Sequence, residues 1–212
     1  MTEVQSISNI IGRRRIEVAL LTDSKANEES FKVLSGRKTS IIHLATHGFY
    51  FSEENTKKNG YYLLSSEIGE GVTKHSSALQ RAGLLLSGGN KAWKGEPVPE
   101  GIEDGVLTAM EIASLDLTGC EVAVLSACET GVGEISDEGV FGLQRAFKIA
   151  GVKTIIMSLW DVDDQATSLM MSEFYKNLLK GKGKRDSFYL AQREVKKVFS
   201  DPRYWAAFIM LD

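Results

Sequence analysis

A short run of residues without charge, Val122 to Ser126, most constrains the fold of this chain. Its apolar and β-prone side chains predict a strand that is buried on both faces, as in the middle of a parallel sheet. Cys128 and a loop containing Gly131 follow directly. Open α/β sheets bind ligands at the carboxyl ends of their strands, so Cys128 lies where chemistry is expected. The alternative, with about equal weight on this stretch alone, is a small apolar residue that fills the core.

A second apolar strand, Ile41 to His47, ends in an imidazole that is followed by Gly48. A thiol and an imidazole on two strand ends are the components of a cysteine nucleophile and its proton-transfer partner. Side chains alternate along a strand, so we expect Ser126 to line the pocket that Cys128 serves. Gly48 has no side chain, so its N–H can approach an oxyanion closely, and His47 can protonate a leaving amine.

Strands and amphipathic helices of ordinary length alternate along the chain, which predicts an α/β domain around a mainly parallel sheet. Residues 16–21 and 41–47 are expected to form parallel strands of one β-α-β unit. Residues 51–105 are weakly patterned, with short apolar runs at 61–64 and 83–86. We expect further strands at 122–126, 154–159 and 205–211, and helices at 2–12, 27–34, 108–115, 140–150, 166–178 and 188–198.

Composition excludes several classes of function. The chain has 212 residues, enough for one domain with a sizeable core, and 25 basic against 28 acidic residues give a net charge of −3. Because phosphate binding needs a concentrated cationic face, we expect no direct contact with nucleic acid. No apolar run reaches the roughly 20 residues needed to span a bilayer, so we expect no membrane contact.

The two cysteines, Cys120 and Cys128, lie on either side of one predicted strand and do not suggest a disulfide framework. A reducing, cytoplasmic setting follows from this usage, and Cys120 is expected to be structural. No His/Cys spacing suits zinc, and neither a dinucleotide fingerprint nor a phosphate-binding loop is present. We therefore expect neither a metal nor a cofactor.

The pairs His47-Gly48 and Ala127-Cys128, each at the end of an apolar strand, resemble the His-Gly and Ala-Cys pairs of the caspase and separase clan of cysteine peptidases. Within this clan the chain resembles the CHAT domain, a caspase-like peptidase often joined to tetratricopeptide repeats. Seven blocks in the same order carry the resemblance: residues 43–49, 79–86, 107–113, 125–131, 139–147, 158–164 and 205–208.

The resemblance implies a caspase-like three-layer α/β fold and endopeptidase activity on a protein or peptide. It makes Cys128 the nucleophile, His47 its partner, and the N–H groups of Gly48 and Cys128 the oxyanion hole. Domains of this family usually begin with further strands and helices, so residues 1–212 are expected to be one domain at the carboxyl end of a longer protein. Tetratricopeptide-repeat or sensor regions of the same or another chain are then expected partners that regulate activity.

Specificity is expected to depend on an acidic cluster, Asp161, Asp163 and Asp164, that follows the strand at 154–159. In the resembling family this strand lies beside the substrate, so Trp160 is either a core residue or a substrate contact. A carboxylate there favours a basic residue before the cut, with Asp164 the first candidate and Asp161 the second. Alternatively, Asp163 or Asp164 caps the helix that begins near Gln165.

Two other functions remain open at this point. One is a non-catalytic signalling or scaffold module, which would need neither the His-Gly nor the Ala-Cys pair. The other is a cysteine acyl hydrolase or transferase of a small molecule, which would need a closed apolar pocket instead of an open groove with a strand edge. His43 lies inside its strand and is expected to be a hydrogen-bonded histidine outside the catalytic pair, and His75 a surface residue.

Overall fold

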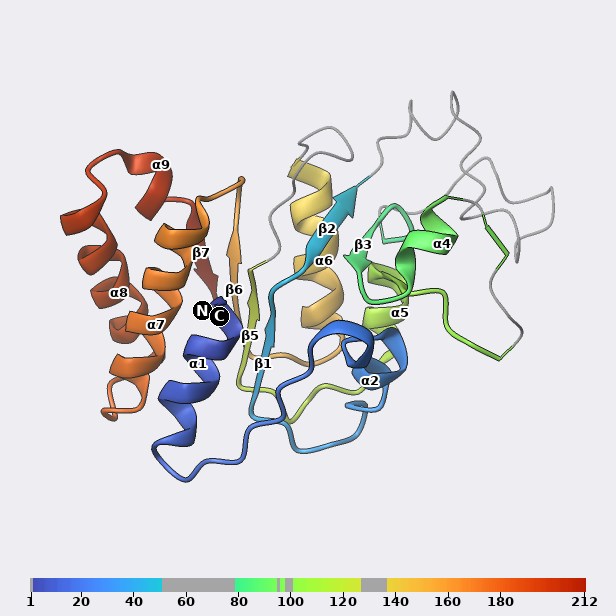
Figure 1. Ribbon diagram of the computed structural model, residues 1–212, viewed down its shortest axis with the longest axis horizontal. Helices are drawn as coiled ribbons and strands as arrows, with labels where there is room; N and C mark the ends of the chain where they lie inside the picture. The colour runs from blue at the N-terminus through green and yellow to red at the C-terminus, as the bar shows by residue number, and fades with distance from the viewer. Residues whose placement is uncertain (1, 51–78, 95, 98–100, 127–136) are drawn as a thin grey trace.

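The computed structural model describes residues 2–50, 79–94, 96–97, 101–126 and 137–212. The described residues form three layers, in which a four-stranded sheet lies between two groups of helices (Figure 1). The order in this sheet is β1-β5-β6-β7. Strands β1, β5 and β6 are parallel, and β7 runs antiparallel to β6. The strands are β1 (Ile41–Leu44), β5 (Val122–Leu125), β6 (Thr154–Ser158) and β7 (Phe208–Leu211). The α/β fold with a mainly parallel central sheet is confirmed.

A second, antiparallel sheet of three strands lies beside the first (Figure 1). Its order is β2-β3-β4, with β2 (His47–Tyr50), β3 (Ala82–Leu85) and β4 (Val106–Thr108). Strand β3 corresponds to the short apolar run expected near residues 83–86. The run expected at residues 61–64 lies outside the described residues, as does His75.

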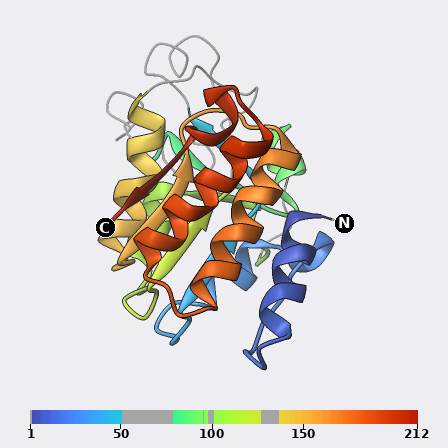
Figure 2. The same ribbon diagram turned by 90° about the vertical axis from the view of Figure 1, so that its left-hand side faces the viewer.

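Helices α1, α7 and α8 cover one face of the four-stranded sheet, and α2, α5 and α6 lie on the other side (Figures 1 and 2). The first group is α1 (Glu3–Gly12), α7 (Asp164–Leu178) and α8 (Lys184–Val198), and the second is α2 (Glu28–Lys32), α5 (Ala109–Ser114) and α6 (Asp137–Ile149). The short helices are η1 (Asp23–Lys25), α4 (Gly89–Trp93) and α9 (Pro202–Trp205).

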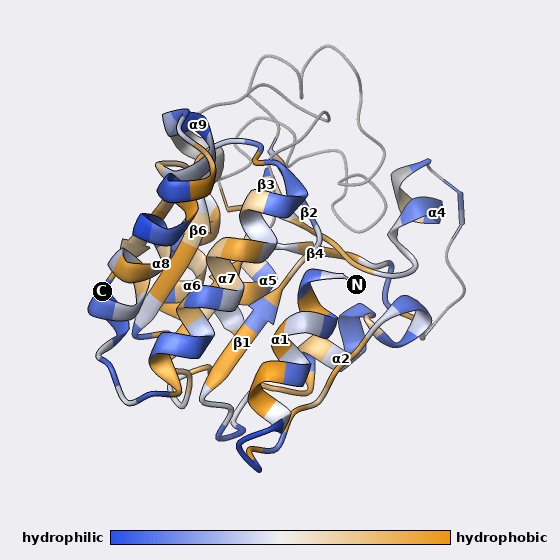
Figure 3. Cartoon of the chain, turned by 60° about the vertical axis from the view of Figure 1, so that its left-hand side comes forward, coloured by the Kyte–Doolittle hydropathy of each residue, from blue (hydrophilic) through white to orange (hydrophobic). Residues whose placement is uncertain are grey.

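The central strand β5 is buried along its whole length, as its sequence predicts. Ala123 and Leu125 face the cluster that includes Phe147 of α6, whereas Val122 and Val124 face the cluster around α7. Successive side chains therefore enter two different cores. Figure 3 shows that strands β1 and β6 consist mostly of hydrophobic residues, as β5 does, whereas the outer faces of the helices are largely hydrophilic.

Local sequence signals set several helix ends. The Thr108 side chain and Glu111 form a capping box at the start of α5, and Asn27 caps α2. Helix α6 is followed by Gly151, whose φ of 98° lies in the left-handed region that closes many helices. A Cβ at this position would lie 2.6 Å from Cγ2 of Thr118, so both the conformation and the space require glycine.

The expected strand at residues 16–21 is wrong. These residues have no regular structure, and Ile16, Leu20 and Leu21 are exposed. Within the described part of the chain β1 is an edge strand that pairs with β5, and residues 16–21 join neither sheet. A strand needs a neighbour to satisfy its ladder of N–H and C=O groups, so the apolar pattern alone did not produce one. The predicted β-α-β unit is therefore absent from the described residues.

Two other boundaries differ from the expectation. The strand predicted over residues 41–47 ends at Leu44, and His47 begins β2 in the other sheet. The hydroxyl of Thr46 donates a hydrogen bond to the Leu85 carbonyl, which holds this turn against β3. The strand predicted over residues 205–211 begins only at Phe208, after the short helix α9, which Asp201 caps.

Candidate functional site

Three parallel strands end side by side at one edge of the sheet. Leu44 of β1 pairs with Leu125 of β5, which pairs with Met157 of β6. His47 follows the first strand end and Ser126 follows the second. Trp160 and Asp161 follow the third, so side chains that are distant in sequence leave the sheet at a common edge. Cys128, its backbone N–H and the loop with Gly131 lie outside the described residues.

His47 lies at the junction of the two sheets. It is the first residue of β2, with Leu85 of β3 opposite, and its side chain is exposed. Gly48, opposite Leu84, is buried. The imidazole is therefore open to solvent, whereas the glycine that follows it is enclosed by its neighbours.

Ser126 belongs to a group of polar side chains on the face of the sheet that α1 and α7 cover. Its Oγ donates a hydrogen bond of 2.7 Å to Oε1 of Glu3, and its N–H donates one of 2.9 Å to the Leu44 carbonyl. The same Glu3 oxygen lies 3.1 Å from Nε2 of His43. The other ring nitrogen of His43, Nδ1, lies 3.1 Å from Oη of Tyr175 in α7. His43 is thus a hydrogen-bonded histidine, as expected.

Tyr175 is the member of this group that α7 contributes. Its burial, together with the charge of Glu3, raises the pKa of the Tyr175 phenol above its ordinary value, so the hydroxyl keeps its proton. A carboxylate only accepts, so the ring donates from Nε2 to Glu3; in the tautomer with this single ring proton, Nδ1 accepts from the Tyr175 hydroxyl. Sequence reasoning missed Glu3 and Tyr175, because nothing in the sequence shows that two helices bring them to this strand end.

The segment after β6 holds the predicted specificity residues. Trp160 is half-buried against the cluster around α7, and its Nε1 donates a hydrogen bond of 3.0 Å to the Arg203 carbonyl of α9. Asp161 is exposed. Oδ1 of Asp163 accepts from the N–H groups of Gln165 and Ala166 at 2.9 and 3.2 Å, so Asp163 is the cap of α7. Asp164 is the first residue of that helix, and its side chain is exposed.

Cys120 is a structural cysteine, as its position before the strand suggests. The residue is 1% exposed, and its thiol donates a hydrogen bond of 3.3 Å to the Val122 carbonyl. Burial raises the pKa of the Cys120 thiol, so the reactive thiolate is disfavoured.

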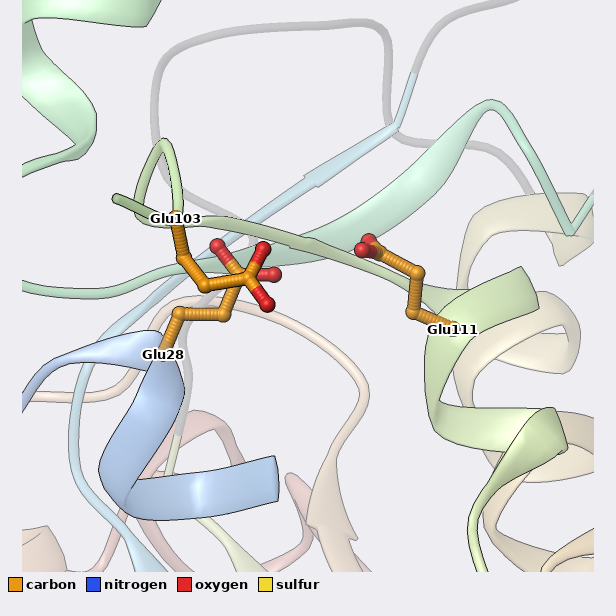
Figure 4. A group of neighbouring side chains, drawn as sticks. All are labelled: Glu28, Glu103 and Glu111. Carbon is orange, nitrogen blue, oxygen red and sulfur yellow. The ribbon is translucent and has the colours of Figure 1, made fainter. Parts of the chain in front are cut away.

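An acidic cluster that the sequence did not predict lies away from the strand ends. Carboxylate oxygens of Glu28, Glu103 and Glu111 approach one another closely (Figure 4). The Lys32 ammonium lies among them, 2.7 Å from Glu28 and 2.9 Å from each of the others. Because an ammonium already stands among the three carboxylates, we interpret the group as an ion-pair cluster. Only the four-residue spacing of Glu28 and Lys32, which allows an ion pair on one helix, could have indicated part of this cluster from the sequence.

This cluster anchors the segment that leads into β4. Oε2 of Glu28 accepts a hydrogen bond of 2.9 Å from the Gly105 N–H. Burial raises the pKa of Glu28 to about 7, although its hydrogen bond with Lys32 opposes the shift. For Lys32, burial would lower the pKa, but hydrogen bonds to the three carboxylates outweigh it and raise the pKa.

In the part of the chain that the structure describes, no helix has the length and apolar character needed to cross a bilayer.

Comparisons with known proteins give one family and two relatives. A family model described as the CHAT domain matches residues 1–212. Tetratricopeptide repeat protein 28 of Mus musculus is 32% identical over 108 residues, which is 50% of this chain and 4% of that protein. The protein of the same name in Homo sapiens is 30% identical over 112 residues, which is 52% of this chain and 4% of that protein. The match thus spans a small part of each relative.

Proposed function

The chain belongs to the CHAT domain family, and from this premise we propose that it is a cysteine endopeptidase that hydrolyses peptide bonds with a His47/Cys128 pair. One observation supports the pairing. Leu44 and Leu125 are direct partners in parallel strands. His47 comes three positions after Leu44, and Cys128 comes three positions after Leu125. From these equal offsets along two paired strands we infer that the two residues leave the sheet at the same edge.

In this proposal His47 takes the proton of the Cys128 thiol, and the thiolate forms a bond to the carbonyl carbon of the substrate. The N–H groups of Gly48 and Cys128 bind the oxyanion that results. The C–N bond then breaks, and His47 gives its proton to the leaving amine. Water attacks the thioester and His47 takes a proton from that water. The C–S bond then breaks, the acid product leaves, and His47 returns the proton to the Cys128 sulfur.

Peptide cleavage tests this proposal directly. We expect the protein to cut members of a peptide library, read by mass spectrometry, and Cys128→Ala to abolish cutting. His47→Ala should remove most turnover. Cys120→Ser is the matched control, because it removes the buried thiol and should leave turnover unchanged. Full activity in Cys128→Ala would overturn the proposal. If an electrophilic probe labels Cys128 but the protein cuts no peptide, the result would favour a non-catalytic module or a hydrolase of small acyl substrates.

We further propose that the protein cuts after a basic residue, with Asp164 as the first and Asp161 as the second carboxylate that binds it. Both side chains are exposed next to the shared strand edge, and Trp160 beside them is held by α9. A guanidinium can form two hydrogen bonds with one carboxylate, so Arg should be preferred to Lys.

The preference is measured by comparing cleavage of peptides that carry Arg, Lys, Leu or Asp directly before the cut. Asp164→Asn or Asp161→Asn should reduce the preference for Arg, by roughly 2–5 kcal/mol if the lost charge partner is buried by the substrate. Asp163→Asn is the control, because Asp163 caps α7. A wild-type preference for Leu or Asp, or a preference for Arg that survives both substitutions, would refute the acidic pocket.

Regulation by a repeat region is the last part of the proposal. Both relatives bear a name that refers to the tetratricopeptide repeat, and this chain matches only 4% of each. We propose that residues 1–212 form one CHAT domain whose activity such a region, in the same or another chain, raises. Equal turnover by the bare domain and by the domain with its repeat region would argue against this regulation.

A further inference from the structure

Glu3, in the first turn of α1, contacts two adjacent strand ends of the sheet. Its Oε1 accepts hydrogen bonds from Ser126, directly after β5, and from His43, in β1. The Glu3 side chain is 15% exposed and that of His43 is 10% exposed, so the contact is largely shielded from water. Hydrogen bonds to a charged acceptor are stronger than neutral ones, and shielding strengthens them further.

The hydrogen bonds form a continuous series from α7 to α1. Tyr175 donates to His43, His43 donates to Glu3, and Ser126 donates to the same oxygen of Glu3. Removal of the carboxylate leaves two donors of limited exposure without their acceptor. The side chain of Ser126 would then lose its partner two residues before Cys128, and the β5 end would keep only the backbone bond from the Ser126 N–H to the Leu44 carbonyl.

Helix α1 is joined to the rest of the described chain through an exposed segment without regular structure, residues 16–22. Ile7 is buried against the cluster around α7, and α1 packs along α7 (Figure 2). A capping box between Thr2 and Gln5 holds the first turn of the helix, next to Glu3. The place of Glu3 is therefore set by how α1 docks on α7 and the sheet.

We propose that Glu3 is a positioning residue, which holds the end of β5 through Ser126 and so couples the docking of α1 to the strand that leads to Cys128. This inference rests on the proposed peptidase function, because the consequence of coupling is a change in turnover. In this proposal Glu3 acts through Ser126 and takes no part in the chemical steps. Movement of α1 would change the reaction through Ser126.

The test measures a local and a functional quantity in the same variants. The local quantity is hydrogen exchange of the Ser126 amide, resolved by NMR, and the functional one is kcat against KM for a peptide that the protein cuts. Glu3→Ala should raise exchange at Ser126 about tenfold and lower kcat by about the same factor, with KM little changed. Glu3→Gln keeps an acceptor oxygen and should restore most of both quantities.

The matched control is Glu17→Ala, which removes an exposed acidic side chain from the segment after α1 and should change neither quantity. If Glu3→Ala does not fold, Ser126→Ala serves instead, because it removes the donor and leaves α1 intact. Ring ¹⁵N shifts of His43 should report the proton on Nε2 in the wild type and change in Glu3→Gln.

Wild-type exchange at Ser126 in Glu3→Ala would overturn the inference, as would a kcat loss that Glu3→Gln does not restore. Uniformly faster exchange over the whole chain would also overturn it, because that marks a general loss of stability. A wild-type protein that cuts no peptide would refute the proposed function alone. In that case a rise in exchange confined to the ends of β5 and β1 still supports the coupling, and its absence refutes it.

Discussion

Replacing Lys32 by Met removes the ammonium that pairs with Glu28, Glu103 and Glu111. Removing one partner of a buried ion pair costs roughly 3–5 kcal/mol, because the other charge stays buried without a partner. The side chain of Glu28 is 1% exposed and bears most of this cost, whereas those of Glu103 and Glu111 are 40% and 36% exposed and partly screened by water. Because Glu28 can take up a proton once its partner is lost, the cost falls below this range. We expect the free energy of unfolding to fall by about 2–3 kcal/mol at about pH 8.

The loss should depend on pH in a defined direction. The pKa of Glu28 is raised to about 7 in the folded protein from an ordinary value of 4.5. Folding therefore takes up a proton between these values, and this carboxyl destabilises the folded state as pH rises through the window. Lys32 holds that pKa down, so Lys32→Met should raise it further. At about pH 5 Glu28 is protonated in both proteins, and the deficit should shrink to about 1 kcal/mol.

Urea unfolding at the two pH values measures the deficit. With a slope of about 2 kcal/mol per molar urea, the midpoint should drop by roughly 1–1.5 M at the higher pH and by about 0.5 M at the lower one. Lys32→Arg is the control, because it keeps the charge and should lose much less stability. An equal deficit at both pH values would mean that lost packing, and not an unpaired carboxylate, explains the effect, and the reasoning would fail.

Three further changes test other parts of the structure. Gly151→Ala should lower the free energy of unfolding by roughly 1–2 kcal/mol, because φ there is 98° and the new Cβ would meet Thr118. Thermal unfolding measures the loss, and the control Gly12→Ala, with open space around its Cβ, should not destabilise the protein. Asp163→Ala should lower the free energy of unfolding by about 1 kcal/mol through loss of the α7 cap. The same preparation should keep the wild-type preference for the residue before the cut. Cys120 should resist iodoacetamide in the folded protein, because burial raises the pKa of its thiol, and should react once urea unfolds the chain. Rapid native labelling of Cys120, read by mass spectrometry, would contradict its structural role.

Much of the central fold could be predicted because its signals are local. The uncharged run that forms β5 is short enough for a strand, and it lies buried between two cores. The apolar spacing of α7 and α8 and the glycine after α6 correctly marked where helices lie and end. Periodicity and capping act within a few residues, so they can be read without knowing what lies nearby in space.

The candidate site could be predicted only as far as strand ends and family motifs allow. His47 and Asp161 follow parallel strands, so their common edge was foreseeable. The sequence does not distinguish Asp163 from Asp164 as the cap of α7, because both stand where a helix begins; the hydrogen bonds identify Asp163. The pairing of His47 with Cys128 stays a prediction.

Residues 16–21 and Glu3 show where local patterns stop being informative. The apolar run at 16–21 has the composition of a strand, but a strand exists only if a neighbouring chain segment satisfies its backbone, and in the described residues none does. Glu3 looks like an ordinary acidic residue of a first helical turn, yet it meets Ser126 far along the chain. Contacts of this kind depend on how whole elements pack, so short-range preferences specified the elements and tertiary packing decided which side chains meet.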